Sequence, residues 1–247
     1  MLTKRFPFLL PIRRFQRKLF FYIGMWLDHR RYARGMSLTA LPHTVFLASS
    51  ELYNQNTGFD MIYQENKVHN LRVLAKSLRG LTIKPGETFS FWQAARRADR
   101  HEPYRDGLVL KDGELTVARA GGLCQMSNLL FWMFLHSPLT IVERHSHRVK
   151  NFATPEGMPE GVDAAISEGW LDLKLTNETD IAFQIDIEFS ETHITGILYA
   201  DKELATAYEI QSRDVTYFEQ EGTTHQQAYV YRNDILLYKN TCIMGVK

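Results

Sequence analysis

Residues 170–189 read Trp-Leu-Asp-Leu-Lys-Leu-Thr-Asn-Glu-Thr-Asp-Ile-Ala-Phe-Gln-Ile-Asp-Ile-Glu-Phe, and this stretch decides the fold class. Apolar and polar residues alternate over 171–176 and again over 181–189, with Asn-Glu-Thr-Asp at 177–180 between them. Strict alternation is typical of a half-buried strand, and Asn and Asp between two such runs favour a turn. The stretch therefore predicts an antiparallel hairpin that turns at 177–180.

Further strand-like runs lie on both sides of this stretch. Upstream, a Pro-Gly turn inside 81–92 and an Asp-Gly turn inside 107–117 each predict a hairpin. Downstream, apolar runs predict strands that continue the sheet, so we expect a strand-rich C-terminal half. The remaining predicted strands lie at 44–54, 139–143, 194–200, 208–218, 226–232 and 235–243.

Two segments have the character of helices. Apolar residues recur at helical spacing over 65–78, and Gly80 follows where a C-cap glycine belongs. From Cys124 to His136 the chain is dense in Leu, Phe, Met and Trp and contains no Gly or Pro, which predicts a buried helix. The predicted fold class is therefore α+β, a mixed, mostly antiparallel sheet with a buried helix that starts at Cys124.

The distribution of charge divides the chain into an arm and a body. The 247 residues are 45% hydrophobic and carry a net charge of +1, so a sizeable core is expected and a nucleic-acid partner is not. Residues 1–34 contain nine Lys and Arg against Asp28 alone, a net charge of +8, which leaves −7 for the remainder. We therefore expect a basic N-terminal arm over 1–34 and a single domain over 35–247.

The arm lacks the marks of a membrane span or a cleaved signal. Its apolar run at 19–27 would extend about 14 Å as a helix, against a hydrocarbon core of about 30 Å. The run ends in Asp-His-Arg-Arg, which is unlike a small-residue cleavage site, so we expect a cytoplasmic protein. Two interpretations of the arm stay open: a peripheral contact with the inner face of the membrane, or packing on its own domain.

Residues 120–128, Ala-Gly-Gly-Leu-Cys-Gln-Met-Ser-Asn, form the candidate functional site. Glycines permit a tight turn, and Cys124 then falls at the N-terminus of the predicted helix, where free amides and the helix dipole favour a thiolate. The amides of Cys124 and Gln125, with the Gln125 side chain, predict an oxyanion site. Further candidate substrate or oxyanion groups are Gly122, Ser127 and Asn128.

A cysteine nucleophile also needs a base and a third group that orients the base. His145 and His147 come about twenty residues after Cys124 and are predicted to lie on a strand, and their spacing places both on one face of it, together with Glu143. One of the two histidines is expected to face Cys124. Asp163, in Gly-Val-Asp-Ala-Ala, is the candidate for orienting the imidazole. This chemistry requires no cofactor.

Other interpretations compete with the catalytic one. Cys124 could be a small core residue, as Cys242 in its apolar strand is expected to be. Cys124, His145 and His147 could together bind zinc, but no further cysteine lies near them in sequence, so no metal site is expected. A disulfide between the two cysteines is left open by the sequence, although a cytosolic chain keeps its thiols reduced.

The chain resembles the VanW family. The core pattern of that family is Gly-Gly-Gly-x-Cys-Gln followed by Ser or Thr, and then Glu-Arg-x-x-His. Ala120 takes the place of the first glycine, and we expect a negative φ there. The matching stretches are 120–125 with Ser127, 143–147, the Lys-Pro-Gly-Glu-Thr-Phe-Ser-Phe at 84–91, 161–173, 177–180, 53–66 and the leader Arg-Phe-Pro-Phe-Leu-Leu-Pro.

This resemblance implies a link to the bacterial cell wall and to glycopeptide (vancomycin) resistance. Some VanW domains act as cysteine L,D-transpeptidases on peptidoglycan stem peptides. Carried over, Cys124 is the nucleophile and His147, the motif histidine, is the base, whereas His145 fills a variable position. The implied partner is a peptidoglycan stem peptide or its precursor.

Two functions are therefore expected as alternatives. The first is a cysteine acyl-transfer enzyme, either transpeptidase-like or an amidase or peptidase, that passes through a thioester. The second is a non-catalytic accessory or binding protein of the same resistance system, in which Cys124 is structural. The absence of an export signal weighs against the first, because cross-linking takes place outside the membrane. The reactivity of the Cys124 thiol separates the two.

Overall fold

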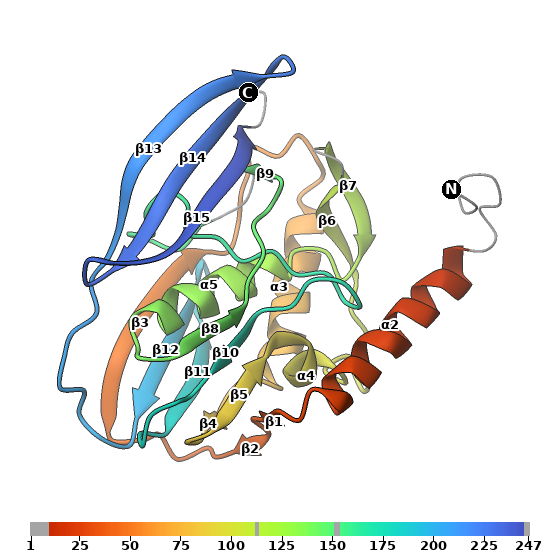
Figure 1. The fold of residues 1–247 in the computed structure, drawn as a ribbon. Coiled ribbons are helices and arrows are strands. Elements are labelled where there is room, and N and C mark those ends of the chain that lie inside the picture. The colour runs from red at the N-terminus through yellow and green to blue at the C-terminus, as the bar shows by residue number, and fades with distance from the viewer. Residues whose placement is uncertain (1–9, 112–113, 151–153, 245–247) are drawn as a thin grey trace.

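The computed structural model describes residues 10–111, 114–150 and 154–244, and its α+β architecture confirms the predicted fold class (Figure 1). Most strand pairs are antiparallel. No helix in these ranges combines the length and the apolar character that crossing a bilayer demands. In chain order the elements are α2 (Leu10–Leu27), β1 (Arg31–Tyr32), β2 (Gly35–Met36), β3 (His43–Glu51), α3 (Ile62–Ala75), β4 (Leu81–Ile83), β5 (Glu87–Ser90), α4 (Phe91–Ala95), β6 (Asp106–Lys111), β7 (Glu114–Arg119), α5 (Cys124–Leu135), β8 (Thr140–Glu143), β9 (Val149–Lys150), β10 (Lys174–Thr176), β11 (Phe183–Phe189), β12 (His193–Ala200), β13 (Ile210–Gln220), β14 (Thr223–Arg232) and β15 (Ile235–Met244).

The helix α5 forms the centre of the core. Every residue of α5 after Cys124 is buried, as the dense apolar run predicts. The helix packs directly on β12 at Gly196, where a Cβ atom would lie 2.3 Å from the Met133 sulfur. A larger residue at that position would push α5 away from the sheet, and with it the first turn that carries Cys124.

The strands fall into four sheets. Two of them, with strand orders β1-β5-β10-β8 and β2-β4-β11-β12-β3, hold most of the elements around the core. The third, β13-β14-β15-β9, is built mainly from the last strands of the chain and stands apart in Figure 1. The strands predicted there are confirmed, but β13 to β15 form a sheet of their own and do not continue that of β11 and β12. The hairpin β6-β7 is the fourth sheet and confirms the prediction for 107–117; residues 112–113 of its turn lie outside the described ranges.

The hairpin predicted for 170–189 is wrong in its pairing. Strands do form on both sides of the turn, yet β10 pairs with β5 and β8, whereas β11 pairs with β12 and β4. The hairpin predicted for 81–92 fails in the same way, because β4 and β5 belong to different sheets. Instead, the segments β4–β5 and β10–β11 each cross from one sheet to the other and lie antiparallel to each other. Strand β4 pairs with β11 in one sheet, and β5 pairs with β10 in the other.

Asn177 holds this crossing together. Its backbone accepts a hydrogen bond from the Gly86 amide at 2.8 Å and donates one to the Glu87 carbonyl at 2.9 Å. Its side-chain amide donates to the carbonyl oxygens of Ile83 at 3.0 Å and Ile181 at 2.7 Å. The side chain is fully buried, so these bonds replace water for backbone groups that lie between the two sheets. A tight hairpin would have left those carbonyls without donors.

Candidate functional site

A strained turn leads into the helix that carries Cys124. Ala120 has a φ of +62°, so the negative φ expected from its side chain is wrong. Gly121 lies so close to β6 that a Cβ atom would stand 2.2 Å from the Gly107 carbonyl carbon, and Gly122 has a φ of +90°. The chain must reverse from β7 into α5 within these residues, and that reversal forces Ala120 into the left-handed region despite its cost.

Cys124 is the first residue of α5, and it is partly exposed where the rest of the helix is buried. Its backbone amide donates to no acceptor among the described residues, whereas the Gln125 amide donates to the Gly122 carbonyl at 3.1 Å. The unused amide and the positive end of the helix dipole both favour negative charge at this point. The Cys124 amide is therefore available to donate to an anionic group.

His147 reaches the thiol from a loop. Strand β8 ends at Glu143 and residues 144–148 are irregular, so the prediction of a strand carrying both histidines is wrong. Asp163 accepts from the His147 backbone amide at 2.5 Å and pairs with its Nδ1 at 2.6 Å. Cys124 is a second side-chain partner of His147, and its hydrogen bond and charge raise the pKa of the imidazole together with those of Asp163.

The electrostatics of His147 favour a charged imidazolium. Burial lowers the pKa of His147, but the hydrogen bonds and charges of Asp163 and Cys124 raise it to about 10. Asp163 is itself buried and fixes both the ring and the backbone of the histidine. The structure thus brings the Cys124 thiol, the His147 imidazole and the Asp163 carboxylate together, with the imidazole between the other two groups.

The two histidines are not equivalent. The His145 Nε2 atom pairs with the Glu143 carboxylate at 3.0 Å, and the His145 side chain is 38% exposed. The structure therefore does not bring His145 to the thiol. The spacing of two residues predicts a common face only for a strand, and this segment is not one.

The polar residues that follow Cys124 face inward. The Ser127 hydroxyl donates to the Ala164 carbonyl at 2.6 Å, and the Ala164 amide donates to the Asn128 side chain at 2.8 Å. Both side chains are fully buried. They fasten the segment that carries Asp163 to α5, and so they position the carboxylate but do not face a substrate.

The Gln125 side chain is also engaged elsewhere. Its amide nitrogen donates to the Ser50 hydroxyl at 3.0 Å and to the Glu51 carbonyl at 2.6 Å, both on β3. Because both amide protons are taken, the side chain has none for an oxyanion. The Gln125 side chain is therefore not a donor at the thiol.

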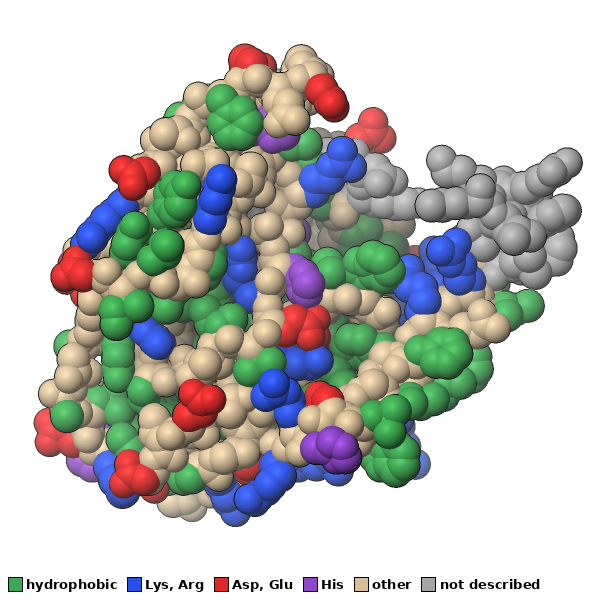
Figure 2. Space-filling model, in the orientation of Figure 1, with side chains coloured by type: hydrophobic (Ala, Val, Ile, Leu, Met, Phe, Trp, Pro, Cys, Tyr) green, Lys and Arg blue, Asp and Glu red, His purple; other side chains and the backbone are tan. Residues whose placement is uncertain are grey.

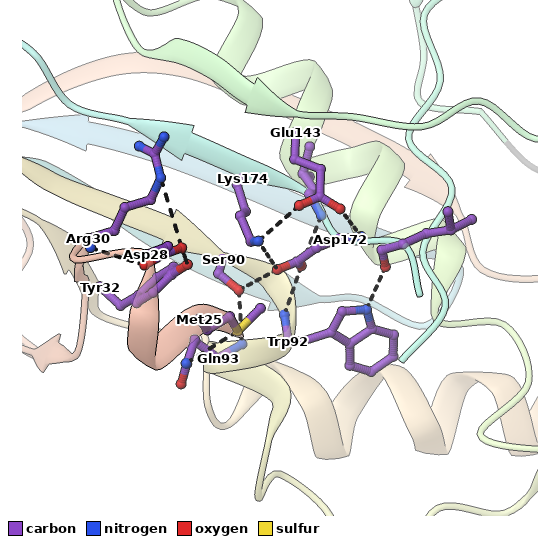
Figure 3. Close-up of polar contacts among 12 residues, drawn as sticks. Met25, Asp28, Arg30, Tyr32, Ser90, Trp92, Gln93, Glu143, Asp172 and Lys174 are labelled. Atoms are coloured by element: carbon purple, nitrogen blue, oxygen red, sulfur yellow. Dashed lines mark hydrogen bonds and ion pairs between the residues drawn. The ribbon is translucent and has the colours of Figure 1, made fainter. Parts of the chain in front are cut away.

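A polar network that sequence reasoning missed supports the segment before His147 (Figure 3). The Glu143 carboxylate accepts from Lys174 at 2.9 Å and from the Asp172 amide at 3.0 Å. Asp172, fully buried, accepts from the Ser90 hydroxyl at 2.6 Å and the Trp92 amide at 3.2 Å. Burial raises the pKa of Asp172 to about 6. The network ties β5, β8 and β10 together just before the histidine loop.

Arg144 anchors the same segment from its other side. Its guanidinium stacks on Tyr238 at 4.1 Å and donates to the Asn240 side chain at 2.8 Å and the Asp163 carbonyl at 3.1 Å. The motif Glu-Arg-x-x-His thus supplies two anchoring side chains and then His147. The sequence offered one signal for these two anchors, because Glu143 and Arg144 belong to the same motif as His147.

Neither a metal site nor a disulfide forms here. Within the ranges described above, no group of three or more His, Cys, Asp or Glu side chains is placed to hold a metal ion. Cys242 lies buried in β15 and is not bonded to Cys124. The chemistry open to this site is that of a thiol beside an oriented imidazole.

Comparison with known proteins identifies the family. The model of the family described as VanW like protein matches residues 66–199. The chain is 49% identical over 253 residues to the vancomycin B-type resistance protein VanW of Enterococcus faecalis, covering 98% of this chain and 92% of that protein. It is 32% identical over 114 residues to YoaR of Bacillus subtilis, covering 46% of this chain and 36% of that protein. No solved structure matches. Because the family model spans more than half of the chain and the enterococcal relative aligns along nearly all of it, the chain belongs to the VanW family.

Proposed function

We propose that this VanW-family protein is a cysteine acyl-transfer enzyme that acts on peptidoglycan stem peptides. The observation that carries the proposal is the contact of Cys124, at the start of α5, with a His147 whose Nδ1 is held 2.6 Å from Asp163. A structural cysteine needs neither an imidazole partner nor partial exposure. The peptide class comes from the family, in which cysteine L,D-transpeptidases occur.

The residues divide the reaction into two balanced steps. The Cys124 thiolate attacks a peptide carbonyl, the Cys124 amide stabilises the oxyanion, and His147 donates its proton to the departing amine as the C–N bond breaks. A thioester remains. His147 then takes a proton from an incoming amine, or from water, whose attack forms the new bond and releases the thiolate. An amine acceptor makes the enzyme a transpeptidase, and water makes it an amidase or peptidase.

The link to vancomycin resistance rests on the enterococcal relative. That protein is named as a vancomycin B-type resistance protein, and the alignment with it covers 98% of this chain. Glycopeptides bind stem peptides, so an enzyme that remodels these peptides fits a role in resistance. We extend the association to this chain on that basis.

An accessory, non-catalytic role is the second candidate. Ser127 and Asn128 form hydrogen bonds with Ala164, and Gln125 forms one with β3. This part of the motif therefore stabilises the fold whether or not the thiol reacts. In that case Cys124 would be a partly buried packing residue, and the protein would bind a stem peptide without changing it.

Thiol chemistry tests the proposal. Cys124 should alkylate with iodoacetamide at about pH 6.5, where a free thiol is almost wholly protonated, and buried Cys242 should not. Cys124→Ser should fold with unchanged circular dichroism and abolish acyl transfer from a synthetic stem peptide, while Cys242→Ser retains it. If Cys124 resists alkylation in the folded protein up to about pH 8.5, the accessory role replaces the enzyme.

A further inference from the structure

Lys67 lies against the turn that carries Cys124. The side chain projects from α3 and is only 9% exposed. A Cβ atom on Gly122 would meet its Cγ at 2.2 Å and its Cδ at 2.8 Å, so the lysine stem crosses the backbone two residues before Cys124. Gly122 is therefore needed for the lysine as well as for the turn, and the lysine side chain passes the turn that leads into the proposed active site.

Among the described residues, no side chain supplies a counter-charge to the Lys67 ammonium. Within the part of the chain that the structure describes, no hydrogen bond or ion pair reaches its Nζ atom, and burial lowers the pKa of Lys67 to about 8. Other lysines pair with carboxylates, as Lys174 does with Glu143 and Lys76 with Glu102. The Nζ atom is not among the fully buried polar atoms that lack a partner, so the stem of Lys67 is buried while its ammonium group meets solvent and is open to a ligand. The missing anion is best supplied by a ligand.

We propose that Lys67 binds a carboxylate of the peptide substrate beside Cys124. The identity of the ligand as a stem peptide rests on the proposed function. Such a peptide offers two carboxylates of the same chemistry, one at its C-terminal D-Ala and one on the α-carbon of its γ-linked D-Glu. An ammonium and a carboxylate brought together away from water attract strongly, which would fix the scissile carbonyl relative to the thiol.

Binding to an inactive variant tests this site separately from catalysis. The Cys124→Ser protein is titrated with the tetrapeptide Ala-γ-D-Glu-Lys-D-Ala, its C-terminal amide, and the form with an amidated D-Glu. The free acid should bind at least about tenfold more tightly than one of the two amides, which identifies the carboxylate used. Adding Lys67→Met should abolish that preference, while adding Lys76→Met, an exposed lysine at the end of α3, should retain it.

Each outcome bears on the proposal. Lys67→Met keeps the buried stem of the side chain and removes a charge without a partner among the described residues, so its unfolding midpoint in urea should match that of the parent, and lost binding would not reflect misfolding. Equal affinity for all three peptides, an undiminished preference in Lys67→Met, or no binding at all overturns the carboxylate site. The proposed function fails on a different measurement, the alkylation of Cys124 in the unmodified protein.

A second inference concerns the outer face of α2. Its inner face is occupied: Met25 is buried, Tyr22 donates to Glu168 at 3.1 Å, and Lys18 pairs with the same carboxylate. Packing on the domain therefore accounts for one side of the arm. In Figure 1 the N-terminal half of α2 projects from the body, and Figure 2 shows hydrophobic side chains along it with Lys and Arg beside them. The exposed apolar side chains are Leu10, Ile12, Phe15, Leu19, Phe20, Ile23, Trp26 and Leu27.

We infer that this face docks on an anionic membrane surface. Phe20 is 68% exposed and Trp26 is 80% exposed, and aromatic rings prefer the boundary between lipid headgroups and acyl chains. Residues 1–34 add a net charge of +8, which is complementary to acidic lipid and not to a second copy of the same basic arm. This inference is independent of the chemistry at Cys124.

Vesicle binding by the full chain tests the surface. The protein should sediment with phosphatidylglycerol vesicles at low salt, much less at about 0.5 M salt, and not with phosphatidylcholine alone. Phe15→Ser, Phe20→Ser and Trp26→Ser together should weaken binding at least about tenfold, whereas Leu38→Ser and Ile235→Ser, equally exposed apolar sites elsewhere, should not. Undiminished binding by the triple variant overturns the inference, as does a dimer that the triple variant loses.

Discussion

His147 differs from its neighbour His145 because only the His147 imidazole has both the Asp163 carboxylate and the Cys124 thiol as partners. A nearby imidazolium stabilises a thiolate by direct charge attraction. We therefore expect His147→Ala to slow the alkylation of Cys124 at about pH 6.5 by about tenfold. His145→Ala should leave the rate within about twofold. Equal effects of the two substitutions, measured by mass spectrometry of the alkylated protein, would show that the pairing with Asp163 is irrelevant to the thiol.

Ala120 stores backbone strain next to this site. An alanine at a φ of +62° pays a steric cost that glycine avoids, while glycine loses more chain entropy on folding. Ala120→Gly, the family residue, should therefore raise the free energy of unfolding by up to about 1 kcal/mol in urea titrations. Ala118→Gly, in the neighbouring strand β7, is the control and should lower it by about 0.5–1 kcal/mol. A destabilised Ala120→Gly would contradict this account of the turn.

At the scale of residues, sequence reasoning selected the three side chains that the structure brings together, Cys124, His147 and Asp163. It assigned Gln125, Ser127 and Asn128 to the oxyanion or substrate site, whereas in the structure their amides and hydroxyl satisfy buried groups of the protein itself. Which of the two they do depends on tertiary contacts. Sequence reasoning did not identify Lys67, because a helical pattern does not distinguish a buried lysine from an exposed one.

At the scale of elements, the crossing of β4–β5 and β10–β11 depends on the buried Asn177. Asn177→Asp keeps the shape and the acceptors of the side chain but removes both donors to Ile83 and Ile181 and adds a charge. The loss of two buried hydrogen bonds should lower the free energy of unfolding by about 2–4 kcal/mol. The adjacent Glu178→Gln, at the surface, should change it by less than about 0.5 kcal/mol. A similar effect of both changes would mean that the corner does not hold the sheets.

The alternation over 170–189 predicts strands and a turn correctly but says nothing about partners. Period-two patterning identifies which face of a strand is buried, and a strand finds its neighbours through contacts distant in sequence. Residues 81–92 and 170–189 each look like a hairpin by themselves. Only together do they form the two crossing pairs, and no local pattern contains that information.

At the scale of the whole molecule, two groups make stability fall as pH rises. The pKa of Asp172 is raised to about 6, so the folded state holds its proton more firmly than the unfolded state between about pH 4 and 6, and stability is lost as pH rises through that window. The pKa of His147 is raised to about 10, so its contribution is complete below about pH 6.5 and is lost as pH rises toward 10. The pKa of Lys67 is lowered to about 8, so this group makes stability rise with pH, but only above about pH 8.

Asp172 and His147 together favour a higher free energy of unfolding at about pH 5 than at about pH 7, and buried His136, with its lowered pKa, opposes them in the same window. Asp172→Asn removes one of the first two groups and should reduce that difference by about 1 kcal/mol. Urea titrations of both proteins at the two pH values measure it. Asp180→Asn, a surface carboxylate paired with Lys202, is the control and should leave the difference unchanged. An identical pH dependence with and without Asp172 would contradict the raised pKa.

The clamp of Ser127 and Asn128 on Ala164 has a consequence for descent within a lineage. A copy of this gene released from selection for chemistry could lose its thiol at once, but it would have to keep these two residues in order to fold. Its sequence would then read Gly-Gly-x-Ser-Gln-x-Ser-Asn, and the residues that stabilise the fold would be retained. Inactive paralogues of this kind should be recognisable by serine in place of Cys124. The rest of the motif would show common descent and would not show that the protein is active.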